Sequence, residues 1–146
     1  MIRVEVFNGH ARRRVRRSGV AAAVRRVARG ERRRAGAFSV VFVGDRATAA
    51  MNRRFLGHAG STDVISFPLG EGGAVEGEIY VNIDRARTQA REYGVPLGEE
   101  VCRLVVHGTL HILGEDDTTA AARRRMKRKE DAYVAVLAPR GNHRWL

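Results

Sequence analysis

The alternation of polar and apolar residues along the chain predicts four short strands. Apolar residues recur at every second position or form brief continuous runs, as expected for strands that are half or fully buried in a sheet. A glycine, a proline or a polar turn residue follows most of these runs. The predicted strands cover residues 2–7, 38–43, 64–67 and 77–83.

Apolar spacing together with cap residues and glycine or proline stops predicts five helices elsewhere in the chain. Val20, Val24 and Val27, for example, fall on one face of a helix. Asp84 is expected to cap the helix that follows the fourth strand. The predicted helices cover residues 11–29, 46–56, 84–93, 97–113 and 118–137. This order of elements indicates the α+β class: a single domain over residues 1–146, with a small four-stranded mixed sheet packed against about five helices.

Composition narrows the class of protein. The chain has 146 residues, the size of one ordinary domain, and its hydrophobic fraction of 44% is typical of globular proteins. No apolar run approaches the roughly 20 residues of a membrane-spanning helix, and the N-terminus lacks the hydrophobic run of a signal peptide. Cys102 is the only cysteine, so no internal disulfide can form. We therefore expect a cytoplasmic protein with no membrane partner and no small-molecule cofactor.

The charge balance indicates a polyanionic partner. Lys and Arg together number 27 against 16 Asp and Glu, which gives a net charge of +11. Such an excess favours nucleic acid, because each phosphate that the protein neutralises releases condensed counterions. Every cation except Lys127 and Lys129 is an arginine, whose guanidinium can donate two hydrogen bonds to one phosphate. A base-composition bias in the genome would also enrich arginine over lysine, although it explains the net charge less well.

Many of these arginines gather near the N-terminus. They lie on the outer face of the first predicted helix and in the connection after it: Arg12, Arg13, Arg14, Arg16, Arg17, Arg25, Arg26, Arg29, Arg32, Arg33 and Arg34. A run of charges is usually a solvated face. Here nearly all the charges have one sign and repel one another unless an anion binds them, so we expect this face to bind phosphate.

Two histidines give the chain its candidate chemistry. His107 and His111 are four residues apart, so both imidazoles project from one face of a helix. Two such imidazoles can chelate a divalent metal, zinc first among them. Gly114 lets the chain turn after the helix and bring Asp117 back as a third ligand through oxygen. Three protein ligands leave a coordination position open for water, as in catalytic sites. The alternative is that both histidines are ordinary packed or solvent-facing side chains.

Three other residues bear on the kind of site. Proteases with paired histidines carry a glutamate as general base directly after the first histidine, whereas Gly108 stands there, so a metalloprotease would lack its base. Asp116 could accept a hydrogen bond from a histidine or act as a base for water; capping the last helix is its alternative role. Glu130 lies on an apolar helical stripe, where we expect it to pair with an arginine from another element.

The segment around the histidines resembles a motif of a known family. Residues 107–117 are similar to the His-Gly-x-Leu-His-x-x-Gly-x-Asp-His motif of the YbeY-type family, metal-dependent endoribonucleases of bacterial ribosomal-RNA maturation. Further similar blocks follow the family's order over residues 40–131: Met51-Asn52, residues 61–68, Gly77-Glu78-Ile79, Glu99-Glu100-Val101 and Met126 with Glu130. The chain is therefore identified by resemblance as a member of that family.

The resemblance implies an activity, a cofactor and partners. It implies one divalent metal ion, zinc first, held by His107, His111 and Asp117. It also singles out Asp63 and Ser66, and Asp63 alone would be interpreted as an ordinary turn residue. The implied enzyme is a metal-dependent, single-strand-specific endoribonuclease that acts in the 3′ end processing of small-subunit ribosomal RNA and in ribosome quality control. Its partners would be ribosomal RNA and the small ribosomal subunit.

Two departures from the family's pattern affect the expected activity. Asp117 stands where the family has its third histidine, and a carboxylate lowers the preference for zinc over harder ions such as Mn²⁺. Leu56 stands where the family usually has an arginine that faces the substrate, which leaves Arg53 and Arg54 as candidate catalytic residues. The alternative function is therefore a ribosome-associated RNA-binding protein with weak or absent hydrolytic activity.

The remaining histidines and the end of the chain are expected at the surface. His10, His58 and His143 are predicted to be surface residues. The basic, aromatic end that holds Arg140, Arg144 and Trp145 is expected to be disordered, with stacking on a base as the alternative.

Overall fold

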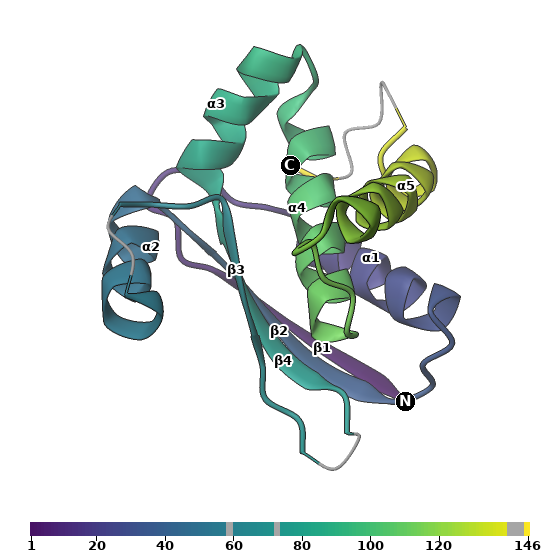
Figure 1. Ribbon diagram of the computed structural model, residues 1–146. Coiled ribbons are helices and arrows are strands. Elements are labelled where there is room, and N and C mark those ends of the chain that lie inside the picture. The colour runs from purple at the N-terminus through teal and green to yellow at the C-terminus, as the bar shows by residue number, and fades with distance from the viewer. Residues whose placement is uncertain (58–59, 72–73, 140–144) are drawn as a thin grey trace.

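The structure is a computed structural model that describes residues 1–57, 60–71, 74–139 and 145–146 (Figure 1). Its sheet contains β1 (Ile2–Asn8), β2 (Gly36–Val43), β3 (Val64–Pro68) and β4 (Glu76–Asn82) in the spatial order β1-β2-β4-β3. The first, second and fourth strands run parallel, and β3 runs antiparallel to β4 at one edge. The expected small four-stranded mixed sheet in an α+β domain is confirmed.

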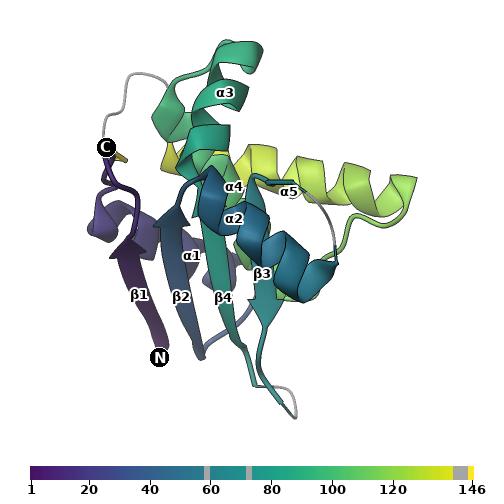
Figure 2. The ribbon, with the colours of Figure 1, turned by 90° about the vertical axis from the view of Figure 1, so that its left-hand side faces the viewer.

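Five helices surround the sheet: α1 (Arg17–Gly30), α2 (Asp45–Met51), α3 (Ile83–Tyr93), α4 (Leu97–Ile112) and α5 (Ala120–Leu137). A π-helical turn, η1 (Asn52–Leu56), continues α2. In both ribbon views α2 lies on one side of the sheet, and α1, α4 and α5 lie on the other (Figures 1 and 2). Helix α4 is central, since it contacts α1, α3, α5, β3 and β4. None of the described helices is long and apolar enough to cross a membrane.

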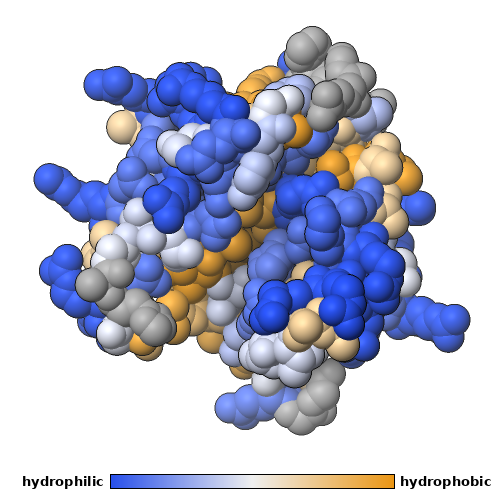
Figure 3. Space-filling model, turned by 45° about the horizontal axis from the view of Figure 1, so that its top comes forward, coloured by the Kyte–Doolittle hydropathy of each residue, from blue (hydrophilic) through white to orange (hydrophobic). Residues whose placement is uncertain are grey.

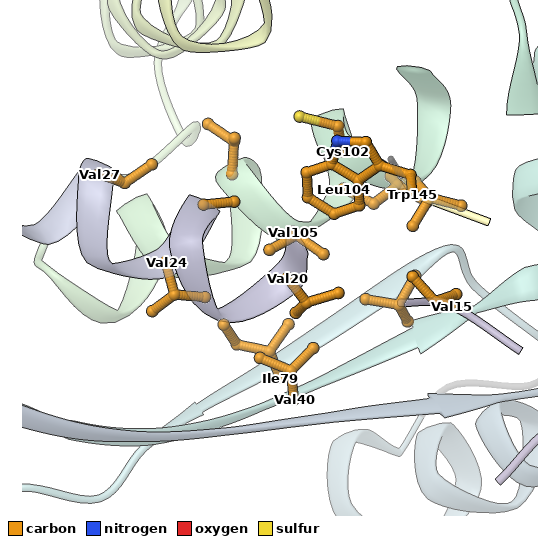
Figure 4. Close-up of a cluster of buried hydrophobic side chains, with 14 of the residues drawn as sticks. Val15, Val20, Val24, Val27, Val40, Ile79, Cys102, Leu104, Val105 and Trp145 are labelled. Atoms are coloured by element: carbon orange, nitrogen blue, oxygen red, sulfur yellow. The ribbon is translucent and has the colours of Figure 1, made fainter. Parts of the chain in front are cut away.

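The hydrophobic core lies between the sheet and helices α1 and α4 (Figure 4). Val24 of α1, Val40 of β2 and Val105 of α4 are fully buried in it. Trp145 completes the core: it is 2% exposed, and its indole Nε1 donates a hydrogen bond to the Leu137 carbonyl at 3.2 Å. The expectation of a disordered or base-stacking end is therefore wrong for Trp145. Burial of its large apolar surface explains why this end is fixed. Arg140, His143 and Arg144 lie outside the described residues, as does His58.

The first helix begins later than expected, at Arg17 rather than at residue 11. The Asn8 side chain holds the preceding segment in place of a helical turn: its Oδ1 accepts from the Val15 amide at 2.8 Å, and its Nδ2 donates to the Val15 carbonyl at 3.1 Å. This bonding satisfies the backbone outside a helix. The arginines at positions 12, 13, 14 and 16 therefore lie outside α1, which corrects the expectation that they share its outer face.

The cap of α3 is also displaced from its expected position. Asn82, not Asp84, is the capping residue, because its Oδ1 accepts from the Arg85 amide at 3.1 Å. Asp84 instead accepts from His10 Nε2 at 2.8 Å and from the Asp45 amide at 3.0 Å. The hydrogen bond from His10 lowers the pKa of the Asp84 carboxyl. The His10 side chain is only 9% exposed, so its expected surface position is wrong.

Candidate active site

Helix α4 carries both candidate metal-binding histidines on one face. The His107 and His111 ring centroids are 6.5 Å apart. Gly108 lets this part of α4 lie close to the sheet, since a Cβ there would meet Ile79 Cγ2 at 2.6 Å and Ser66 Oγ at 3.1 Å. The Ser66 hydroxyl donates to the Gly108 carbonyl at 3.3 Å. The position that holds a general base in proteases therefore packs against β3 and β4 and has no room for a side chain.

The turn after α4 returns the chain toward His107. Gly114 adopts φ +104°, a conformation that side-chain-bearing residues rarely adopt. Asp117 then lies with its Oδ2 4.0 Å from His107 Nε2. The Arg123 guanidinium donates to the Asp117 carbonyl at 3.2 Å, which fixes this loop against the start of α5. The geometry thus brings Asp117 to the face of α4 that bears the histidines.

Glu130 of α5 orients His107 from the opposite side of the ring. Its Oε2 lies 2.6 Å from His107 Nδ1, and its Oε1 accepts from Arg103 Nη1 at 3.3 Å. Arg103 also pairs with Asp131 at 2.9 Å. The predicted pairing of Glu130 with an arginine is confirmed. The hydrogen bond that His107 donates to Glu130 is the main reason that the pKa of His107 is raised. When Nδ1 carries the proton and donates to Glu130, Nε2 is left free on the side of Asp117.

The histidine face opens on a cavity of about 570 Å³. His107, His111 and Asp117 line it together with Asp63 and Ser66 of the β3 side. The space-filling view shows a hollow with an apolar floor between the α2 side and the α4–α5 side of the molecule (Figure 3). His111 Nδ1 is buried and has no hydrogen-bond partner among the described residues. Since buried polar atoms are nearly always hydrogen-bonded, an unpartnered imidazole nitrogen here suits a site that binds a polar group.

The described side chains do not by themselves enclose a metal. No group of three or more His, Cys, Asp or Glu side chains within the described ranges is arranged to hold an ion. Two atoms that ligate one tetrahedral zinc are roughly 3.3 Å apart, given metal–ligand distances of about 2.0–2.2 Å. Asp117 Oδ2 at 4.0 Å from His107 Nε2 is therefore less than an ångström from that separation. The chemistry of the donor set suits a divalent metal. The ring centroids of His107 and His111 are 6.5 Å apart, so the two imidazoles as well as the exposed Asp117 carboxylate would have to move closer together to hold one.

The three residues considered for catalysis lie away from the cavity. Arg53 and Arg54 are exposed on η1 and do not line the cavity, and the Arg54 guanidinium lies 5.3 Å from the Phe55 ring centroid. Leu56 lines the cavity instead. Asp116 is exposed and accepts hydrogen bonds from Thr118, as an ordinary turn residue does. The catalytic roles of Arg53, Arg54 and Asp116 stay predictions.

Two roles predicted for Asp116 belong to other residues. Glu130, not Asp116, accepts the orienting hydrogen bond from a histidine, as described above. The cap of α5 is Thr119, whose hydroxyl accepts from the Ala122 amide at 3.0 Å. The sequence alone indicated the Thr119 cap only weakly, because Asp116, Asp117 and Thr118 are all residues that cap helices well.

Sequence reasoning missed Glu100 as a residue of this region. It is 3% exposed on α4 and lines a second hollow, which it shares with Arg103, His107 and Glu130. Burial raises the pKa of its carboxyl to about 7. The available signal was a glutamate seven residues before His107, two helical turns away on the same apolar helix.

Comparison with known proteins agrees with this fold. The family model described as "Endoribonuclease YbeY" matches residues 8–138. An endoribonuclease YbeY from Chlorobaculum parvum is 34% identical over 140 residues, which cover 96% of this chain and 99% of that protein. One from Flavobacterium psychrophilum is 36% identical over 77% of this chain and 80% of its own. The solution structure of TM1509 from Thermotoga maritima superposes with a TM-score of 0.65 at 27% identity, over 94% of this chain and 89% of that one.

These similarities place the chain in a class of RNA-cleaving enzymes. It belongs to the YbeY family of endoribonucleases.

Proposed function

We propose that this protein is a metal-dependent, single-strand-specific endoribonuclease that uses His107, His111 and Asp117 to hold one divalent metal ion. The observation that carries the proposal is the hydrogen bond between Glu130 and His107, at 2.6 Å. It fixes the imidazole in the orientation that leaves Nε2 facing Asp117, in the cavity that His111 also lines. A carboxylate that holds the far nitrogen of a ligating histidine is a common feature of metal sites.

Each residue around the cavity would have its own role in the proposed reaction. Glu130 holds the proton at His107 Nδ1 and raises the basicity of the ring. Asp117 and Asp63, from two different segments, both line the cavity with carboxylates. A divalent metal bound there would act as a Lewis acid and supply a water nucleophile at neutral pH. Arg53 and Arg54 could reach a phosphate only where RNA extends past η1, since neither lines the cavity.

The proposed substrate is the 3′ end of the small-subunit ribosomal RNA, and the proposed partner is the small ribosomal subunit. The protein would also act in ribosome quality control and would be located in the cytoplasm. Membership of the family and the net charge of +11 support an RNA substrate. The test is cleavage of a single-stranded RNA with the sequence of that 3′ end, with the same RNA annealed into a duplex as the control. We expect cutting of the single strand that stops with chelator and returns with Zn²⁺ or Mn²⁺. RNA cleavage that continues unchanged in the presence of chelator would contradict metal dependence.

A second function is favoured by one observation. Leu56 places an apolar side chain in the cavity wall where the family usually has an arginine, and no arginine lines that cavity among the described residues. Charge that develops on a phosphoryl oxygen would then lack a guanidinium partner. A ribosome-associated RNA-binding protein with weak hydrolysis is the resulting alternative. Normal RNA binding by a protein that is metal-free as purified and cuts no RNA would favour it.

A further inference from the structure

A third hollow, larger than the histidine cavity and distinct from the hollow that Glu100 lines, lies on a different part of the molecule. It has a volume of about 910 Å³ and lies between strand β1 and the C-terminal end of α1. Six arginines line what we name the basic groove: Arg3, Arg25, Arg29, Arg32, Arg33 and Arg34. They come from three separate segments, an edge strand, a helix and the connection after it, so folding rather than sequence proximity alone gathers them.

Their positive charges are left largely uncompensated. Glu5 is the one acidic residue that lines the basic groove among the described residues. Glu31 lies in the middle of the arginine run but is turned away, because its carboxylate accepts from Lys129 and from the Tyr133 hydroxyl at 2.7 Å. No groove arginine forms an ion pair with a carboxylate of the described residues within 4.0 Å. Like charges at such density are stabilised by an anion.

The backbone fixes this arrangement. The helix end is closed by hydrogen bonds from the Arg32 amide to the Arg29 carbonyl at 2.9 Å and from the Arg33 amide to the Ala28 carbonyl at 2.8 Å. The Arg25 guanidinium donates to the Ile2 carbonyl at 3.2 Å, which fastens α1 to the edge strand. The exposed side chains of Arg29 and Arg34 therefore project from an ordered backbone, so binding of an anion does not also require the backbone to be ordered.

The basic groove adjoins the helix that carries the histidines. Arg33 Nη2 donates to the Leu113 carbonyl at 3.3 Å, two residues beyond His111. In Figure 1 the start of β1, the end of α1 and the end of α4 all lie at the lower right of the molecule. A polymer bound in the histidine cavity could therefore continue past the end of α4 into the groove.

We infer that the basic groove binds the phosphate backbone of the RNA segment that flanks the strand in the histidine cavity. This inference rests on the proposed function for its substrate class. Arginine presents a planar fork that matches phosphate, and six guanidiniums along one groove suit a chain of phosphates better than a single small anion. The groove positions RNA without reading bases, since it offers cations rather than a pattern of base-specific donors and acceptors.

The test compares the salt dependence of RNA binding by two variants that lose the same charge. The groove variant carries Arg29→Gln, Arg32→Gln and Arg34→Gln; the control carries Arg85→Gln, Arg91→Gln and Arg128→Gln, all exposed and outside the groove. Fluorescence anisotropy with a labelled single strand of about 20 nucleotides, in chelator so that nothing is cut, gives the slope of log K against log salt. The groove variant should lose about 2 from the magnitude of that slope, at about 0.7 for each phosphate contact, and the control should lose far less.

A lysine variant and a vesicle-binding measurement serve as further controls. A variant with Arg29→Lys, Arg32→Lys and Arg34→Lys should keep most of the slope, which separates loss of charge from loss of fold. Equal slopes for the groove variant and the control would overturn the inference. Loss of binding to anionic phospholipid vesicles with an unchanged RNA slope would also overturn it and would assign the groove to a lipid surface. If wild-type protein fails to cut RNA while the two slopes differ, the proposed enzymatic function fails and the groove remains.

Discussion

Glu130 of α5 lies 2.6 Å from Nδ1 of His107 on α4, although the two residues are 23 positions apart in the chain. Glu130 is 9% exposed, and the second oxygen of its carboxylate accepts a hydrogen bond from Arg103. A buried carboxylate that bonds both an arginine and a histidine holds the imidazole in one orientation. This contact joins the packing of α5 on α4 to the chemistry of the candidate metal site.

Replacement of Glu130 should weaken the metal site without unfolding the protein. Loss of such an orienting carboxylate typically lowers metal affinity by about 10- to 100-fold. We expect Glu130→Gln to do so and to lower the pKa of His107 in the metal-free protein, because the bond that raises this pKa is lost. NMR titration of the His107 ring and zinc binding by competition with a chromophoric chelator measure the two effects.

Asp131→Asn is the matched control for that variant. Asp131 is the next residue and also pairs with Arg103, at 2.9 Å, but among the described residues it forms no hydrogen bond or ion pair with His107. We expect its removal to leave the His107 titration nearly unchanged. Equal shifts in the two variants would show that general electrostatics, not the specific contact, sets the pKa of His107.

Replacement of Asp117 should change which metal the protein prefers. Imidazole favours zinc, whereas a carboxylate is also suited to Mn²⁺ and Mg²⁺. Asp117→His should therefore raise the ratio of zinc to manganese affinity by roughly tenfold or more. Asp116→His, one residue earlier in a turn that faces Thr118, is the control and should leave the ratio close to that of the wild type. A ratio that both variants raise equally would exclude Asp117 as a ligand.

Glu100 should make stability depend on pH. Burial raises the pKa of its carboxyl in the folded protein from 4.5 to about 7, so the folded state holds a proton that the unfolded state releases. This contribution to stability is fully present below pH 4.5 and is lost as pH rises through about 7. Glu100→Gln should therefore unfold at higher denaturant than the wild type at pH 8, by roughly 2–3 kcal/mol in the free energy of unfolding.

The pH profile separates this effect from a change in packing. Near pH 4.5 the difference between Glu100→Gln and wild type should shrink toward zero, because the wild-type carboxyl is then protonated in the folded state. Urea unfolding at several pH values measures it, with Glu92→Gln, an exposed change at the end of α3, as the control. A gain in stability that is the same at every pH would contradict the raised pKa.

Trp145 should contribute strongly to stability. The side chain is 2% exposed, and the Trp145 carbonyl accepts from the Arg16 amide at 3.2 Å, which ties the end of the chain to the start of α1. Trp145→Ala should lower the free energy of unfolding by about 3–5 kcal/mol. Urea unfolding followed by far-UV circular dichroism checks this, and Leu146→Ala, a change at a more exposed neighbour, should cost much less. A loss below about 0.5 kcal/mol for Trp145→Ala, the size of an ordinary surface change, would contradict the buried position.

Local patterns were enough to predict most of the fold. Apolar patterns, with cap residues and glycine or proline stops, predicted all four strands and five helices, and the spacing of His107 and His111 predicted both rings on one helical face. The start of α1 was wrong because the Asn8 side chain satisfies the backbone around Val15, which no periodicity reveals.

The features of the site that the sequence did not predict depend on tertiary contacts. Glu130 could be predicted to have a partner, since a buried carboxylate is costly alone, but the choice of His107 follows from how α5 packs on α4. The basic groove likewise depends on the approach of Arg3 on the edge strand to the end of α1. The prediction for Trp145 was wrong because residues near the end of a sequence are often disordered, whereas in the fold its side chain packs into the hydrophobic core with residues of α1 and α4.

Metal content per chain tests the central claim most directly. Protein purified without chelating resin or tag is dialysed against trace zinc, and bound metal is measured by elemental analysis for wild type, His111→Ala and the control Asp116→Ala. The account predicts about one metal ion per chain for wild type and for Asp116→Ala, and a near-complete loss for His111→Ala. A wild-type protein that binds no metal, or a metal content that His111→Ala leaves unchanged, would contradict it.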